Sequence, residues 1–163
     1  MILYHGSNVA VKQPEIRQHN RAVDFGGGFY TTTNRVQADR WARRVARLNG
    51  GSPTVSVYEF DANLVKNLRE LTFPMPNEAW LQFVSANRNQ IHLAQPYDLV
   101  IGPVANDDVF TTLQAYFAGV LDAEETLKRL KIKDLFDQYV FKTTKALDFL
   151  KFTEYREVSD DSN

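Results

Sequence analysis

The sequence contains no cysteine among its 163 residues. Disulfide bonds, zinc–thiolate centres and cysteine nucleophiles are therefore excluded. It also lacks a long hydrophobic run. The apolar start, Met1–Tyr4, is interrupted by His5, so we expect no signal peptide. The later stretch Leu99–Ala105 is far too short to span a membrane. These absences predict a soluble, cytoplasmic protein.

A strong net charge is also missing, because 19 basic residues face 20 acidic ones and leave a formal charge of -1. This balance excludes a bulk electrostatic attraction to nucleic acid or anionic lipid, although a local basic patch stays possible. The hydrophobic content of 44% is typical of a packed core. We expect one domain over residues 1–158, followed by a polar tail over residues 159–163.

The pattern of apolar and turn-forming residues predicts an α+β fold. The expected strands are Ile2–His5 (ended by Gly6), Phe29–Thr33, Thr54–Phe60, Tyr97–Ile101 (closed by Gly102-Pro103), Gln138–Thr143 and Phe152–Val158. Helices are expected after the N-caps Asn34, Asn77 and Asp122, over Asp107–Phe117 and over Ala146–Leu150. A long loop is expected over Val9–Gly28, where polar runs and glycines gather.

The helix after Asn34 combines an apolar stripe with several arginines. The stripe consists of Ala38, Trp41, Ala42, Val45 and Ala46. The arginines, mostly on its other side, are Arg40, Arg43, Arg44 and Arg47. Two interpretations stay open for them: a solvated cationic face, or a surface that contacts phosphate or a partner.

Two segments carry the strongest functional signal, Tyr4-His5-Gly6-Ser7 and Gly26-Gly27-Gly28-Phe29-Tyr30. A histidine at a strand edge and a tyrosine after a glycine turn suit a pocket for a ribose and a flat aromatic ring. The triple glycine lacks the spacing of a dinucleotide fingerprint and the lysine of a P-loop. Each residue alone has an ordinary structural explanation, so the signal lies in their order and spacing.

His5-Gly6-Ser7 resembles the first signature of ADP-ribosyltransferases of the diphtheria-toxin and poly(ADP-ribose) polymerase group. The strand from Gly28 to Thr32 resembles their second signature, and Trp41 lies eleven residues after Tyr30, where that group has a second aromatic ring. The third signature is a strand that begins with glutamate, and Gln138-Tyr139-Val140-Phe141 is its counterpart here.

A closer similarity, nearly end to end, is to a little-characterised bacterial family of the same superfamily. The shared segments are the Tyr-His-Gly-Ser start, Asp24–Tyr30, Trp80–Phe83, Tyr97–Ala105 and Asp137-Gln138. This resemblance implies a single-domain, ADP-ribosyltransferase-like fold with a split antiparallel β-sheet.

The resemblance also implies the chemistry: transfer of one ADP-ribose from NAD to a protein or nucleic-acid acceptor, without a metal. His5 would bind a ribose hydroxyl, while Gly6 and Ser7 hold the nicotinamide carboxamide. Tyr30, reached from Gly28, and Trp41 would enclose the nicotinamide ring by stacking and cation–π attraction. The resemblance suggests a bacterial toxin or effector with a small antitoxin-like partner. No association with membranes is expected, because the sequence lacks an apolar run long enough to span one.

Gln138 stands where the group has a glutamate, and it keeps hydrogen-bonding reach without charge or basicity. Several interpretations remain open. One is that the acceptor needs little activation. Another is that Asp24, Asp137 or the Asp107-Asp108 pair supplies the charge. A third is that the domain binds NAD or ADP-ribose without catalysis. A protein-interaction domain without ligand is a further alternative.

Three other features have weaker functional signals. Asp107 and Asp108 stand at a predicted helix start, where carboxylates favour the positive end of the helix dipole. An RNA 2′-phosphotransferase ranks low because no matching set of basic residues is present. His19 and His92 have no convincing partner in the sequence and receive no function.

Overall fold

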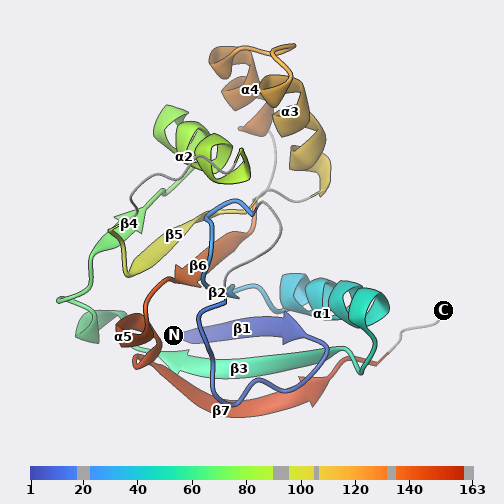
Figure 1. Cartoon of the computed structure of the whole chain (residues 1–163), viewed down its shortest axis with the longest axis vertical. Coiled ribbons are helices and arrows are strands. Elements are labelled where there is room, and N and C mark those ends of the chain that lie inside the picture. The colour runs from blue at the N-terminus through green and yellow to red at the C-terminus, as the bar shows by residue number, and fades with distance from the viewer. Residues whose placement is uncertain (18–22, 90–95, 105–106, 132–134, 160–163) are drawn as a thin grey trace.

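The computed structural model describes residues 1–17, 23–89, 96–104, 107–131 and 135–159. It confirms the α+β class, with helices packed around two β-sheets (Figure 1). The strands are β1 (Ile2–Ser7), β2 (Phe29–Thr31), β3 (Thr54–Phe60), β4 (Glu70–Thr72), β5 (Leu99–Pro103), β6 (Asp137–Phe141) and β7 (Leu150–Glu157). The helices are α1 (Arg35–Asn49), the 3-10 turn η1 (Ala62–Leu64), α2 (Glu78–Arg88), α3 (Asp107–Phe117), α4 (Ala123–Leu130) and α5 (Thr144–Leu147).

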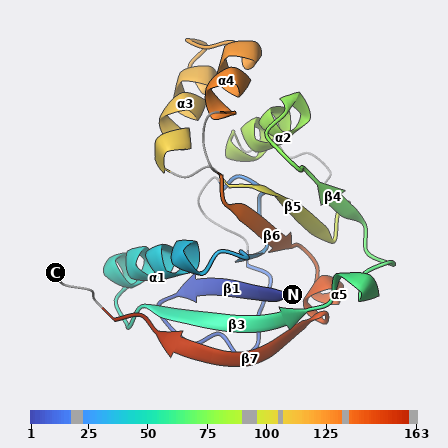
Figure 2. The same ribbon diagram turned by 180° about the vertical axis from the view of Figure 1, so that it is seen from behind.

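The first sheet is antiparallel, in the order β1-β3-β7. The central strand β3 is buried from Thr54 to Tyr58, because α1 covers one face and the interior of the protein the other. Figure 2, the view from behind, shows α1 lying along this sheet beside β1.

The second sheet has the order β2-β6-β5-β4. The resemblance implies antiparallel pairing throughout, but β4 pairs with β5 in parallel. The two sheets meet where Tyr4 of β1 and Thr32 exchange backbone hydrogen bonds of 2.8 and 3.0 Å. This contact brings the strand that carries His5 against the strand that carries Tyr30.

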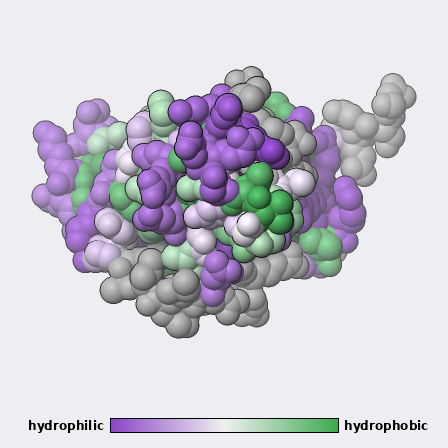
Figure 3. Space-filling view, turned by 90° about the horizontal axis from the view of Figure 1, so that it is seen from above, coloured by the Kyte–Doolittle hydropathy of each residue, from purple (hydrophilic) through white to green (hydrophobic). Residues whose placement is uncertain are grey.

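Two buried clusters hold the sheets and helices together. The inter-sheet core includes Leu3, Phe29, Tyr58, Phe60 and Phe141. The helix-side core lies between the second sheet and α2, α3 and α4; it includes Phe25, Trp80, Leu81, Leu113 and Val140. Seen from the side of these helices, the surface is mostly hydrophilic, with small hydrophobic regions between the hydrophilic ones (Figure 3).

The predicted N-caps are confirmed. The side chains of Asn34, Asn77 and Asp122 each accept a hydrogen bond from a backbone N–H three residues later. Gly50 closes α1 by donating its N–H to the carbonyl of Ala46 at 2.8 Å. In the described part of the chain, no helix has the length and apolarity needed to cross a membrane.

Several sequence-based boundaries are wrong. Gly6 does not end β1 but lies inside it, and a Cβ there would come within 2.2 Å of the Ala38 carbonyl oxygen. The strand expected over Tyr97–Ile101 is displaced to Leu99–Pro103, with Gly102 and Pro103 as part of it. The short strand β4, with two exposed residues, was not predicted.

The prediction for the faces of α1 is also partly wrong. Trp41 does not belong to the buried stripe: it is 50% exposed, whereas Ala38 and Ala42 are buried against the sheet. Arg43 lies on the sheet side of the helix and donates to the carbonyl of Ser159 at 3.0 Å. Small residues thus let α1 approach the sheet closely, and the large ring points outward.

Candidate functional site

His5 joins the first and second signature segments directly. Its Nδ1 lies 2.7 Å from the carbonyl oxygen of Tyr30, and its ring stacks on Phe29 with the centroids 4.3 Å apart. Because a carbonyl only accepts, Nδ1 carries the proton and donates. In the neutral ring, Nε2 is then an acceptor, which suits a ligand hydroxyl.

Tyr30 is fixed by its hydroxyl and by its strand. The hydroxyl donates to the Gly26 carbonyl at 2.6 Å and accepts from the Phe25 N–H at 3.3 Å. Burial raises the pKa of Tyr30 well above its ordinary value, and the negative charge of Asp24 raises it further. The phenol therefore stays neutral, and the turn before β2 sets the direction of the ring.

Gln138 of β6 is 4% exposed, and its Nε2 has no hydrogen-bond acceptor among the described residues. Gln138 and Val140 are two residues apart in one strand, so their side chains project to the same face of the sheet. Tyr30 pairs directly with Val140 across β2 and β6, so it shares that face. Tyr30 and Gln138, predicted from segments far apart in the chain, therefore lie on one face of one sheet.

The glycines of the two signatures are required by close backbone contacts. A Cβ at Gly28, where φ is 154°, would lie 2.7 Å from the Phe141 carbonyl oxygen. The missing Cβ of Gly6 faces α1 rather than a ligand. Strand alternation nevertheless directs the N–H and C=O of Gly6 to the same edge as those of Tyr4, which bond to Thr32. Beside it, the Ser7 hydroxyl donates to the Asn8 side chain at 3.4 Å.

Two of the carboxylates proposed to replace the missing glutamate charge, Asp24 and Asp137, have hydrogen-bond partners of their own. Asp24 is buried and accepts from the Arg88 guanidinium at 2.5–2.6 Å. Asp137 accepts from the hydroxyl of Thr32 at 2.9 Å and from the N–H and hydroxyl of Thr33 at 2.8 and 2.5 Å. Asp24 thus balances the half-buried Arg88, and Asp137 anchors the turn that leads into α1.

Some predicted residues lie outside the described part of the chain. His19 and His92 fall there, and so do the side chains of Asp107 and Asp108, although α3 begins at Asp107 as predicted. In the described part of the chain, no group of histidine and acidic residues could hold a metal ion.

Lys142 is a site residue that sequence analysis missed. Its Nζ donates to the Phe25 carbonyl, next to the glycine turn. Burial lowers the pKa of Lys142 to about 8. The alternation of Gln138 and Val140 in β6, continued by Lys142 just after the strand, was the available signal.

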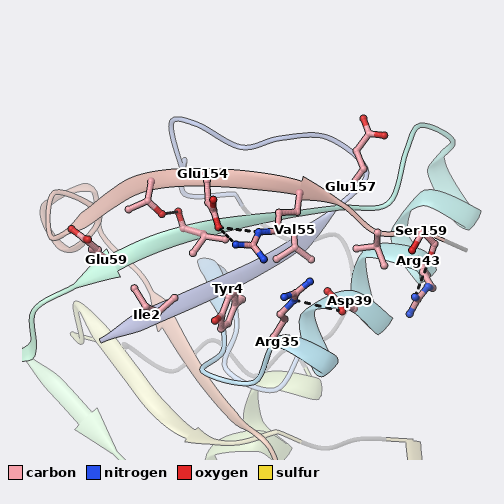
Figure 4. Close-up of a pocket in the computed structure, with 14 residues that line it drawn as sticks. Ile2, Tyr4, Arg35, Asp39, Arg43, Val55, Glu59, Glu154, Glu157 and Ser159 are labelled. Carbon is pink, nitrogen blue, oxygen red and sulfur yellow. Dashed lines mark hydrogen bonds and ion pairs between the residues drawn. The ribbon is translucent and has the colours of Figure 1, made fainter. Parts of the chain in front are cut away.

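An open groove of about 460 Å³ lies between α1 and β7, away from His5 (Figure 4). Tyr4, Val55 and Val57 form its apolar floor. His5 follows Tyr4 in β1 and therefore points to the opposite face of the sheet. A second open groove, beside Met1 and Phe60, is likewise not lined by His5, Tyr30 or Gln138.

The architecture and the site define a class: an α+β protein whose two sheets meet at a His–Tyr contact. Comparison with known families then shows that the chain belongs to the family described as "protein of unknown function (DUF3990)", whose model matches residues 1–152. The comparisons with curated proteins and with solved structures found no match.

Proposed function

We propose that this protein has an ADP-ribosyltransferase-like fold, binds NAD, and transfers one ADP-ribose to a macromolecular acceptor. The proposal is supported by the joining of β1 and β2 through His5 and Tyr30, which combines the two signature segments. It is supported also by Gln138, which shares a face with Tyr30 at the position of the third signature.

The observation that carries the proposal is the buried Nε2 of Gln138. An N–H group that is buried without an acceptor costs about 1–3 kcal/mol, and such groups are rare in folded proteins. A ribose hydroxyl oxygen is an acceptor of the right kind. NAD would supply it through the nicotinamide ribose, beside a nicotinamide ring on the Tyr30 side.

The remaining roles follow from the donors and acceptors present. His5 Nε2 would accept from a second ribose hydroxyl, and the backbone of Gly6 would bind the carboxamide with help from Ser7. The proposal assigns no stacking to Trp41, because Arg44 lies 5.5 Å from its ring centroid and the side chain is half exposed. Of these two aromatic residues, Tyr30 alone is assigned to stacking.

In the reaction, the bond between the nicotinamide nitrogen and ribose C1′ breaks, and nicotinamide leaves with the electron pair. A lone pair of the acceptor forms the new bond to C1′, and the acceptor loses a proton to solvent. A neutral Gln138 positions the ribose but does not stabilise the positive charge that develops. By analogy with other deleted electrostatic groups, the missing carboxylate charge lowers the stabilisation of the transition state by about 3 kcal/mol.

A second candidate is an NAD-binding or ADP-ribose-binding protein without transferase activity. It is favoured by two observations: Arg88 already balances the charge of Asp24, and Asp137, next to Gln138 in β6, projects to the opposite face of the sheet. The first signature would then serve recognition alone.

A nicotinamide-release assay separates the two candidates. We expect slow release by the wild-type protein, faster release by Gln138→Glu, and none by His5→Ala. Glu154→Gln, in the open groove between α1 and β7, is the matched control and should behave as wild type.

If Gln138→Glu released nicotinamide and the wild type did not, the second candidate, a binding protein without transferase activity, would be favoured. The proposal would be wrong if neither protein released nicotinamide and NAD left their melting temperatures unchanged, because a ligand of the folded state must stabilise it.

A further inference from the structure

The outward side of α1 carries large apolar side chains together with arginines. We call this surface the α1 outer face; its residues are Val36, Arg40, Trp41, Arg44, Arg47 and Leu48, all exposed. At about 100° per residue, they fall within an arc of roughly 140°. The arginines occupy the middle of the arc, with Val36 at one margin and Trp41 and Leu48 at the other.

The apolar side chains of this face are unusually accessible. Val36, Trp41 and Leu48 are 54%, 50% and 56% exposed, whereas the residues that α1 buries are Ala38 and Ala42. The helix therefore packs against its sheet through small residues and directs its largest ones to solvent. Aromatic residues and arginine, which this face combines, are enriched in protein interfaces relative to the rest of the surface.

The α1 outer face has no acidic residue. The one carboxylate of α1, Asp39, lies on the sheet side, 4.0 Å from Arg35, and lines the groove of Figure 4. Within the described part of the chain, Arg40 and Arg47 form no ion pair. Arg44 lies 5.5 Å from the ring centroid of Trp41, a geometry in which cation–π attraction orients both side chains.

We propose that the α1 outer face is a docking surface for an acidic protein partner. Carboxylates of the partner would pair with Arg40 and Arg47, and its apolar side chains would cover the two margins. Arginine and tryptophan are the residues most enriched at the energetic centres of protein interfaces. A carboxylate also matches the planar, two-pronged guanidinium better than it matches lysine.

The arrangement of side chains favours a protein over the other anionic partners. A base can stack on Trp41, but the aliphatic Val36 and Leu48 gain nothing from phosphates or stacked bases. A membrane-bound helix needs one continuous apolar face, whereas here the arginines separate the apolar margins. The proposal is independent of NAD chemistry, because none of its residues belongs to the proposed NAD site.

The test uses a fluorescently labelled synthetic helical peptide that combines glutamates with leucines, and measures its anisotropy with the full chain. Poly-glutamate of equal charge, single-stranded oligo-dT of equal charge and phosphatidylserine vesicles are the competing probes. We expect saturable binding of the peptide, at least ten-fold tighter than binding of either polyanion. Emission of Trp41 should shift to the blue, while Trp80, which is buried, reports no change.

The double variant Arg40→Glu/Arg47→Glu should weaken peptide binding at least ten-fold, and Trp41→Ala should weaken it several-fold. Arg129→Glu on α4, an exposed arginine outside the face, is the matched control and should bind as wild type. Equal or tighter binding of oligo-dT or of vesicles would overturn the proposal in favour of nucleic acid or lipid. If binding of the peptide did not saturate at millimolar concentration, the proposal would also be overturned, and the α1 outer face would be a solvated cationic face.

Discussion

Replacing Gln138 with methionine should stabilise the protein while weakening its binding of NAD. Methionine has nearly the length and volume of glutamine, and it removes the buried Nε2 that has no acceptor among the described residues. Leaving such a group unsatisfied costs about 1–3 kcal/mol. For a chain of this size, each kcal/mol corresponds to about 2–4 °C in melting temperature, so Gln138→Met should melt roughly 2–12 °C higher.

The assay is thermal unfolding without and with millimolar NAD, followed by circular dichroism. Gln138→Met should begin from a higher melting temperature and gain less from NAD than the wild type does. Gln82→Met, the same substitution at an exposed position of α2, should change neither quantity. If Gln138→Met melted several degrees lower than wild type, the amide would be satisfied in the folded protein, and the reasoning would be refuted.

Two further predictions concern stability. The Arg69 guanidinium and backbone N–H hold the pKa of Asp98 at about 2, below its value near 4 in the unfolded chain. Their interaction with Asp98 therefore adds to the free energy of unfolding above about pH 4, and this contribution is lost as the pH falls towards 2. Urea unfolding at several pH values should show the free energy of unfolding fall with pH, and the fall should be smaller in Asp98→Asn. An equal fall in the variant and in the wild type would contradict the assignment. Gly6→Ala should cost about 3 kcal/mol, because the new Cβ would lie 2.2 Å from the Ala38 carbonyl oxygen and 2.8 Å from the Ala42 nitrogen. A loss below 0.5 kcal/mol in the same assay, on the scale typical of surface changes, would show that α1 moves aside easily.

Local interactions made much of the fold predictable from the sequence. The caps Asn34, Asn77 and Asp122 depend on residues three positions apart, and all were predicted. The strand Thr54–Phe60 and the helix Asp107–Phe117 were predicted with their observed bounds. The pairing of β2 with β6 joins residues about a hundred positions apart, and no local pattern contains it.

The errors arose where tertiary contacts outweigh local preference. Gly6 suggested the end of a strand, but it is needed where α1 approaches β1. Helical spacing placed Trp41 on the apolar stripe, yet the side chain does not belong to the buried stripe and faces solvent. The strand β4 is short and half polar, and its parallel pairing with β5 stabilises it rather than its own sequence.

The candidate site was predictable only in part. The sequence placed His5, Tyr30 and Gln138 on strands, and the structure adds the His5–Tyr30 hydrogen bond and the face common to Tyr30 and Gln138. Neither the burial of the Gln138 amide nor the pairing of Asp24 with Arg88 can be read from local sequence. Both depend on neighbours that are distant along the chain.

The most direct test of the NAD site is a calorimetric titration of NAD into the wild-type protein and into His5→Ala. We predict saturable binding of one NAD per chain by the wild type, and at least ten-fold weaker binding by His5→Ala with the same melting temperature within a few degrees. Absence of binding by the wild type, or equal binding by both proteins, would contradict the site built from His5, Tyr30 and Gln138.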